Sequence, residues 1–349
     1  MTVTETSQTV PALRGERGRR ARRSLVVTTA LGVSAFAMFV LTMMWGSVWL
    51  SVGDVLGSLL RTTANKGIDF IVLDIRLPQA AAALTVGLAL GVSGTLFQQL
   101  LRNPLAAPDF VGVSSGASVA AVAGIVLHDA GGVGISAMAM VGALVAAALM
   151  YVLAFRDGLS GYRFILVGIG VSAFMTGIVG YLLTRADIHD ARKAMHWLVG
   201  SVGQAGPTEL RVLMVVVAVL VPVAVVLQRQ LRAMELGDDL ARGLGTRVEL
   251  ARFALIAVPV VLIGLATAVA GPIMFVALVA GPVANRLLGP STGGVLAAAF
   301  TGAGMLLVAD LVARHMLPSP LPTGVVTGAV GAPYLLWLLA TTNREGAGG

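Results

Sequence analysis

The chain contains no cysteine, only two lysines, and few charged residues of either sign among its 349 positions. The absence of thiols excludes disulfides, thiolate metal sites and a cysteine nucleophile. Neither Lys66 nor Lys193 follows a glycine, so the glycine-rich loop that cradles nucleotide phosphates is missing as well. Any ATP that drives this protein must therefore be hydrolysed by another chain.

Hydrophobic residues make up 57% of the sequence and charged residues 12%, a balance typical of a multi-spanning membrane protein. Apolar runs long enough to cross a bilayer, about 20 residues each, lie near residues 24–44, 79–99, 111–127, 136–155, 163–183, 210–228, 253–270, 273–288, 293–313 and 322–341. We therefore expect an all-α integral membrane protein with about ten transmembrane helices. The third and eighth spans are short or broken by glycine, and no soluble domain of useful size is left over.

The positive residues indicate how the chain is oriented, because basic residues in short loops are retained in the cytoplasm. With the N-terminus inside, 16 arginines fall in inner loops against 8 basic residues outside. The basic run Arg14–Arg23 could instead bind nucleic acid or belong to a cleaved signal, but it adjoins a full-length span without a cleavage pattern. We therefore expect no nucleic-acid partner. The predicted parts are a basic cytoplasmic tail (1–23), a transmembrane domain in the cell membrane (24–341) and a C-terminal tail (342–349).

A polar island at residues 229–252 separates two apolar runs and carries nine of the charged residues. Leu231, Met234 and Leu240 are spaced for short amphipathic helices. Turns between such helices need positive backbone dihedrals, and three glycines supply them: Gly237, Gly243 and Gly245. The island predicts a compact cytoplasmic knob of two short helices that docks a partner. A solvated connecting loop remains the alternative, since charge runs are usually wet surface.

A second informative stretch follows the second span, from Gly91 to Ala117. Pro104 and Pro108 stop the helix, while Asn103 and Asp109 can cap backbone groups, which predicts a tight inner turn. The turn leads into a helix rich in glycine, serine and alanine, residues that let neighbouring helices approach closely.

The run from Arg102 to Ala117 resembles the signature of the permeases for iron siderophores and vitamin B12 in ATP-binding-cassette importers. Six further pieces agree in order along the chain: Ile75–Pro78, Trp197–Ser201, Glu235–Gly245, Gly271–Val276, Ala309–Arg314 and Leu321–Thr327. The likeness covers the chain from about Ser51 to Leu339. It implies the fold of the vitamin B12 importer permease, a transport subunit without an active site of its own.

The resemblance also implies partners and site residues. Two permeases, identical or paralogous, pair around a central pathway, cytoplasmic ATPase subunits hold ATP and magnesium, and an extracytoplasmic binding protein delivers the substrate. The coupling residues for the ATPase would be Glu235, Gly237, Asp238, Asp239, Arg242, Gly243 and Gly245. Asp238, Asp239 and Arg242 are the docking candidates, because partly exposed charges tune encounter and register.

On the outer face, Arg76 and Arg314 match the arginines that meet acidic residues of the binding protein. Gln79 stands where many relatives have another arginine, which removes one charged contact. Residues assigned to the structure or the pathway are Arg102, Asn103, Pro104, Gly168, Ser172, Thr176 and Asp310. Gly168, Ser172 and Thr176 recur along one side of the fifth span, where they line a cavity or pack against another helix.

Asp310 is an acid inside the membrane, which is expensive unless it is paired. Arg314 follows one turn later, so a salt bridge that orients Arg314 outward is the favoured interpretation and a proton relay the alternative. The four histidines, His128, His189, His196 and His315, fall in predicted outer loops. They suggest a metal site, but no cluster of carboxylates or sulfur accompanies them and a siderophore already fills the coordination shell of iron. We expect no metal ligation.

These patterns together predict an importer permease whose cargo is a ferric siderophore, because the segment Asn103–Gly112 looks most like permeases for ferric catecholates. Vitamin B12 and haem are the rival cargoes within the same family. A secondary transporter or channel that works without ATP would need intramembrane ion-coupling residues, which are scarce here. A purely structural membrane subunit would need neither outward arginines nor an inward knob.

Overall fold

The computed structural model describes residues 6–62, 65–104, 106, 112–154, 161–289 and 294–346. All ten predicted spans coincide with helices: α1 (Thr6–Met44), α4 (Leu77–Leu100), α5 (Val113–His128), α6 (Val133–Ala154), α7 (Gly161–Arg185), α9 (Pro207–Met234), α11 (Val248–Ala270), α12 (Val276–Leu288), α13 (Val295–His315) and α14 (Thr323–Gly346). In the described part of the chain, seven helices are long and apolar enough to cross a membrane. The third and eighth spans, α5 and α12, are shorter, as predicted. The all-α membrane fold is thus confirmed.

Several short elements escaped the sequence analysis: α2 (Val52–Leu59), α3 (Lys66–Asp69), the π-helix η1 (Phe70–Arg76), α8 (Ile188–Val199) and the 3₁₀ helix η3 (Val202–Gln204). Local capping explains two of them. Ser51 and Asp54 form a capping box at the start of α2. At the start of α8, Asp187 accepts the backbone N–H groups of Asp190 and His189, each at 2.9 Å, which lowers the pKa of its carboxyl group.

The second span begins earlier than the sequence predicted. We expected it to start near residue 79, after the segment Ile75–Pro78, but α3, η1 and α4 form one continuous helix from Lys66 to Leu100. Proline lacks a backbone N–H and normally marks a helix start. Here the wider π turn of η1 precedes Pro78, and the N–H of Leu77 donates to the carbonyl of Val72. Arg76 therefore lies within a helix and not in a loop.

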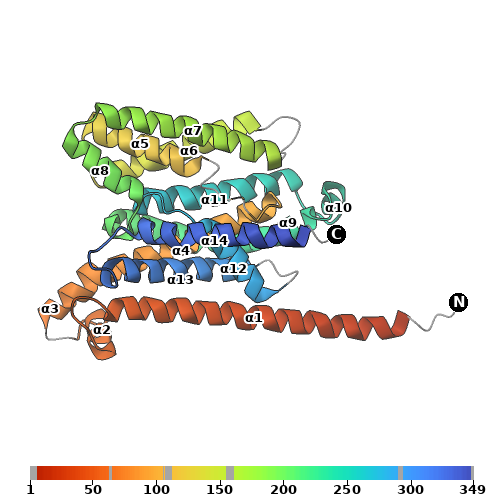
Figure 1. Ribbon diagram of the computed structural model, residues 1–349. Coiled ribbons are helices and arrows are strands. Elements are labelled where there is room, and N and C mark those ends of the chain that lie inside the picture. Colours follow the sequence, from red (N-terminus) through yellow and green to blue (C-terminus); the bar gives the residue numbers. More distant parts are fainter. Residues whose placement is uncertain are drawn as a thin grey trace.

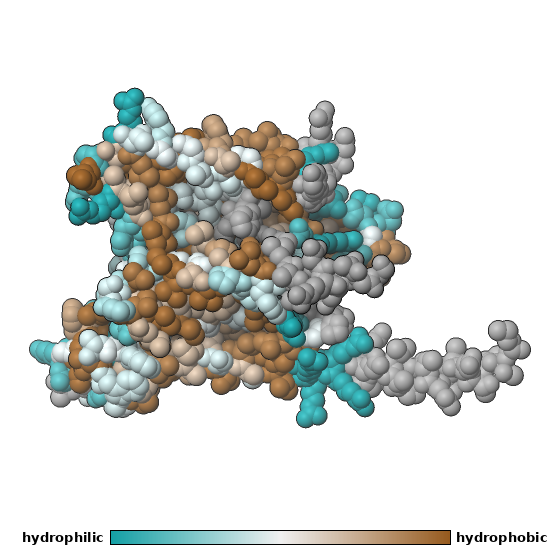
Figure 2. Space-filling view, in the orientation of Figure 1, coloured by the Kyte–Doolittle hydropathy of each residue, from teal (hydrophilic) through white to brown (hydrophobic). Residues whose placement is uncertain are grey.

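The long helices run side by side, with α1 at one edge of the bundle and α7 at the opposite edge (Figure 1). The elements α2, α3 and α8 lie at one end of the bundle, while α10 (Asp238–Gly243) and the start of α1 lie at the other. These ends are called the α8 end and the α10 end below. Hydrophobic side chains cover the sides of the bundle, and hydrophilic ones gather toward its ends (Figure 2). This surface is the one that a membrane-spanning bundle requires.

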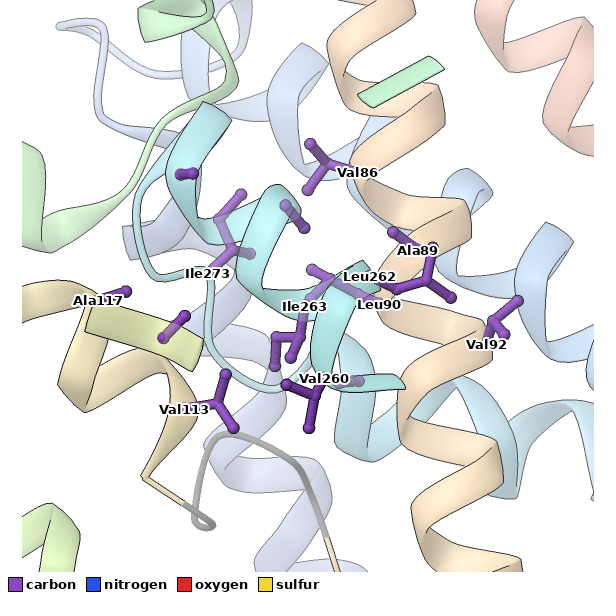
Figure 3. Close-up of a cluster of buried hydrophobic side chains, with 14 of the residues drawn as sticks. Val86, Ala89, Leu90, Val92, Val113, Ala117, Val260, Leu262, Ile263 and Ile273 are labelled. Atoms are coloured by element: carbon purple, nitrogen blue, oxygen red, sulfur yellow. The ribbon is translucent and has the colours of Figure 1, made fainter. Parts of the chain in front are cut away.

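Helix α4 is the centre of the bundle. In its most apolar stretch of 18 residues, 83% of the residues are buried, against 6% in the corresponding stretch of α1. Its apolar side chains meet those of α11 in the core, and α11 in turn separates α4 from α5 (Figure 3). Against α13 the two backbones touch, because glycines face each other. A Cβ atom added at Gly87 would lie 2.6 Å from the carbonyl oxygen of Gly302. Small residues at this contact allow the close packing that membrane helices use in place of hydrophobic burial.

Candidate functional site

The polar island forms a short separate helix at the α10 end. Instead of two short helices, the structure has one, because α9 continues straight to Met234 and only α10, six residues long, stands apart. Gly237 and Gly245 flank α10 with φ angles of 108° and 85°, as predicted for turn glycines. The prediction for Gly243 is wrong, since it is the last residue of α10 and has no positive φ. Leu231 and Met234 are buried in α9, whereas Leu240 is exposed.

The charged residues of this segment form a small network of ion pairs. The Nη2 atom of Arg252 donates to both carboxylate oxygens of Asp238, at 3.2 and 3.0 Å. Arg242 contacts Asp239 at 3.2 Å and Glu249 at 3.7 Å. The Asp239 side chain is fully exposed and that of Arg242 is 54% exposed, while Asp238 points toward the bundle. Of the three predicted docking charges, only Asp239 and Arg242 are displayed freely at the surface.

Three leucines surround these charges, of which the sequence analysis named Leu240 and missed Leu236 and Leu244. Leu236, Leu240 and Leu244 are 63%, 62% and 67% exposed. Leucines four residues apart lie on one side of a helix, and this spacing within a charged segment could have revealed the exposed apolar surface. Exposed leucines on a short helix beyond the apolar band form a surface suited to a partner's apolar cleft.

Below α10 lies a cavity of about 280 Å³ that is lined by the ends of α4 and α9 and the start of α11. Arg102 lines it, has a positive φ of 50°, and donates to the backbone carbonyl of Glu235 at 3.3 Å. The N–H of Asn103 donates to the carbonyl of Gln98, so Arg102, Asn103 and Pro104 form the tight turn predicted after the second span. Pro108 and Asp109 lie outside the described residues.

At the α8 end, the predicted docking arginine Arg76 is buried. Its side chain donates to three backbone carbonyls near the end of α1: Nη1 to Met43 and Met44, both at 2.8 Å, and Nη2 to Val48 at 2.5 Å. The guanidinium group thus fastens η1 to the end of α1. The role in docking a binding protein stays a prediction, but the group is not displayed at the surface of this single chain.

The second arginine, Arg314, lies in a buried polar cluster on α13. The predicted salt bridge is present: Nε of Arg314 is 2.9 Å from Oδ1 of Asp310. The hydroxyl of Thr323 donates to the same carboxylate oxygen at 2.9 Å, and Nη1 of Arg314 donates to Oε1 of Gln79. These partners leave the Arg314 side chain 20% exposed, and its outward orientation toward a binding protein stays a prediction. Gln79 thus accepts a hydrogen bond from Arg314 and helps to hold that side chain in place.

The residues assigned to the pathway follow one another at intervals of four on α7, so they lie along one side of that helix. Gly168 is buried, and Ser172 is half-buried beside the start of α5, where a Cβ atom added at Gly112 would lie 3.5 Å from the Ser172 hydroxyl. Thr176 is exposed, and its hydroxyl donates to the carbonyl of Ser172 at 2.8 Å. Ser172 therefore packs α7 against the start of α5, and the exposure of this side of α7 increases toward Thr176. Their part in a pathway stays a prediction.

Of the four histidines, His196 has a resolved side-chain partner, since its Nδ1 lies 3.0 Å from Nε2 of Gln204 on η3. In the described ranges, no group of three or more His, Asp or Glu side chains converges as a metal site would require. Trp197, whose indole could have anchored in the bilayer surface, is 7% exposed and belongs to the core.

The comparisons with known proteins identify this helical membrane bundle as a transport permease subunit and not an enzyme. The chain belongs to the FecCD transport family, whose sequence profile matches residues 33–341. It is 38% identical to the ferric enterobactin transport system permease protein FepG of Escherichia coli, over 93% of this chain and 98% of that protein. It is 40% identical to the achromobactin transport system permease protein CbrC of Dickeya dadantii, over 93% and 95% of the two chains.

Members of the family with other names, for hemin and cobalamin transport, are 33% and 32% identical. Among solved structures, the fold matches an inward-facing conformation of a putative metal-chelate type ABC transporter, with a TM-score of 0.79 and 23% identity over 90% of this chain and 99% of that one. The protein is therefore a multi-pass membrane permease subunit of an ABC importer family that handles iron siderophores, haemin or vitamin B12.

Proposed function

We propose that this permease imports a ferric siderophore of the catecholate type into the cytoplasm, driven by separate ATPase subunits that hold ATP and magnesium. The observation that carries the proposal is the 38% identity, over nearly the whole of both chains, to a permease named for ferric enterobactin. The haemin and cobalamin relatives have lower identity over similar lengths. The 40% identity to the achromobactin permease supports a siderophore cargo as well, without naming enterobactin.

The geometry of the α10 end supports the drive by a partner ATPase. A six-residue helix between two glycine joints, with leucines and charges displayed outward, fits a cleft on another protein. This end would face the cytoplasm, because the basic residues Arg14 to Arg23 are at the same end of α1. The opposite end would then receive the extracytoplasmic binding protein, and a second permease, identical or paralogous, would complete the pathway.

Transport without ATP is less well supported. Within the described helices, Asp310 and Arg76 are the only charged residues classed as buried. Asp310 is held by Arg314 and Thr323, and Arg76 by backbone carbonyls. An ion-coupled transporter needs an intramembrane acid that can exchange its proton or cation, and a carboxylate with two fixed partners is poorly suited to that role.

The proposal is tested by uptake of radiolabelled iron in cells that lack this chain and in cells with the chain restored. Iron is offered as ferric enterobactin, as a ferric hydroxamate and as haemin, and labelled vitamin B12 is offered in parallel. We expect restoration of ferric enterobactin uptake only, and its loss when cellular ATP is depleted.

The other cargoes are the controls within the same experiment. Restored uptake of haemin or vitamin B12 with unchanged ferric enterobactin uptake would replace the cargo and keep the importer class. Restored uptake that persists without ATP, in the presence of an ion gradient, would contradict the ATPase drive.

A further inference from the structure

The three predicted docking charges of α10 are not equivalent in the structure. Asp239 is fully exposed, and Arg242 pairs with it at the surface. Asp238 instead pairs at 3.0 Å with Arg252 of α11, and both residues line the cavity below α10. The Arg252 side chain is 25% exposed and the Asp238 side chain 40% exposed, so this pair is better shielded from water than the pairs of Arg242.

Few contacts hold α10 against the bundle. Ala241 is its one buried side chain, and both ends of the helix are glycine joints with positive φ. Between α10 and α11, the described ion pairs are Asp238–Arg252 and the more exposed pair of Arg242 with Glu249 at 3.7 Å. A helix attached in this way can swing on its joints unless a side chain ties it to the body of the protein.

The tie at Arg252 leads into the rigid part of the molecule. Arg252 is in the second turn of α11, and one turn further on Leu255 and Ile256 are buried in the main core. In the most apolar stretch of α11, 72% of the residues are buried. The helix ends at Ala270, whose carbonyl accepts the N–H of Ser201, just after α8, at 2.7 Å. A displacement of Arg252 therefore acts on one packed element that spans the bundle from end to end.

We propose that Arg252 is a positioning residue for coupling: its ion pair with Asp238 transmits the movement of the ATPase-docked α10 to α11, so that Asp238 serves transmission and not docking. This inference rests on the proposed function, since it requires an ATPase partner. It assigns a role to a residue outside the motif Glu235–Gly245 and reassigns one within it.

The test uses four variants of the full chain, purified with its ATPase subunits and assayed for uptake of ferric enterobactin in cells. Asp238→Asn and Arg252→Gln each remove one side of the pair. The double variant Asp238→Arg/Arg252→Asp restores the pair with its charges exchanged. Arg211→Gln, an exposed arginine at the far end of α9, controls for the loss of one positive charge.

We expect each single variant to keep the wild-type amount of co-purified ATPase and its ATP hydrolysis, while uptake falls about fivefold or more, the lower range of measured coupling between sites. The exchanged pair should recover at least half of the uptake, and Arg211→Gln should transport as the wild type does. Hydrolysis without transport, reversed by exchange of the charges, is a result that loss of folding cannot produce.

Other outcomes overturn the inference in distinguishable ways. If ATPase is lost from the Asp238→Asn complex in proportion to uptake, Asp238 is a docking contact. If both single variants transport as the wild type does, or if the exchanged pair fails to rescue them, the ion pair carries no coupling. If the wild-type complex itself shows no ATP-dependent uptake, the proposed function is wrong and the inference is overturned with it.

Discussion

The two ends of this bundle use the same charged residue types in opposite ways. At the α8 end, Arg76, Arg314 and Asp310 are largely buried and bound to fixed partners, three of them backbone carbonyls. At the α10 end, Asp239 and Arg242 remain in water beside exposed leucines. Burial makes an unpartnered charge expensive, whereas an exposed ion pair contributes little. The α8 end therefore has fixed geometry, whereas the α10 end leaves charges and leucines exposed, as the proposed contact with an ATPase requires.

The sharpest way to break this comparison is Asp310→Ala. The variant leaves the mostly buried guanidinium of Arg314 without its ionic partner, so we expect the free energy of unfolding to fall by about 3–5 kcal/mol. Thermal unfolding of the purified protein in detergent measures the change. Thr323→Val is the matched control, because it removes one neutral hydrogen bond to the same carboxylate and should cost about 1 kcal/mol. Equal effects of the two variants would show that Arg314 finds water or another partner.

Arg76→Met should have the next largest effect. It keeps much of the side-chain volume but removes the donor to the carbonyls of Met43, Met44 and Val48. We expect a loss of about 1–3 kcal/mol for buried acceptors left without a partner, measured by the same unfolding assay. Arg61→Met, at an exposed position of the same region, serves as the control. A loss no larger than that of the control would mean that water replaces the guanidinium group.

At the α10 end, a glycine pair tests whether flexibility is confined to the joints. Gly237 has φ 108° and ψ 150°, a region that residues with a Cβ atom rarely adopt, so Gly237→Ala should strain the joint by about 1–3 kcal/mol. Gly243→Ala sits in a helical conformation and should be neutral or stabilise by about 0.4–1 kcal/mol. Hydrogen exchange of the α10 amides in each variant separates local from global effects. Similar results for both variants would contradict the observed backbone.

The smallest effect is expected for Asp239→Asn. The side chain is fully exposed, and surface substitutions of this kind change the free energy of unfolding by less than about 0.5 kcal/mol. The unfolding assay should therefore find the variant indistinguishable from the wild type. The amount of co-purified ATPase then reports any docking role without interference from stability. A destabilisation comparable to that of Asp310→Ala would abolish the contrast between the two ends.

Much of the site could be predicted from spacing alone, but only where the partners are close in sequence. Asp310 and Arg314 are four residues apart on one helix, and their salt bridge was predicted and is present. The contact of Arg314 with Gln79 joins residues 235 positions apart, and that of Arg76 with Met43 joins residues 33 apart. Sequence periodicity does not predict pairs that are so far apart, so the partners of these two arginines could not be predicted.

The sequence by itself determined that this is a helical membrane permease, where its ten spans lie and which motifs relate it to its family. It could do so because apolar length and motif order are local properties of the chain, and every backbone group in lipid must be satisfied within its own helix. Only the tertiary structure decided which charges are buried, that Lys66–Leu100 is one helix through a π turn, and that Asp238 pairs with Arg252 at the edge of a cavity. Those outcomes depend on which distant helices pack together, and the close approach of glycine-lined backbones at α4 and α13 sets that packing.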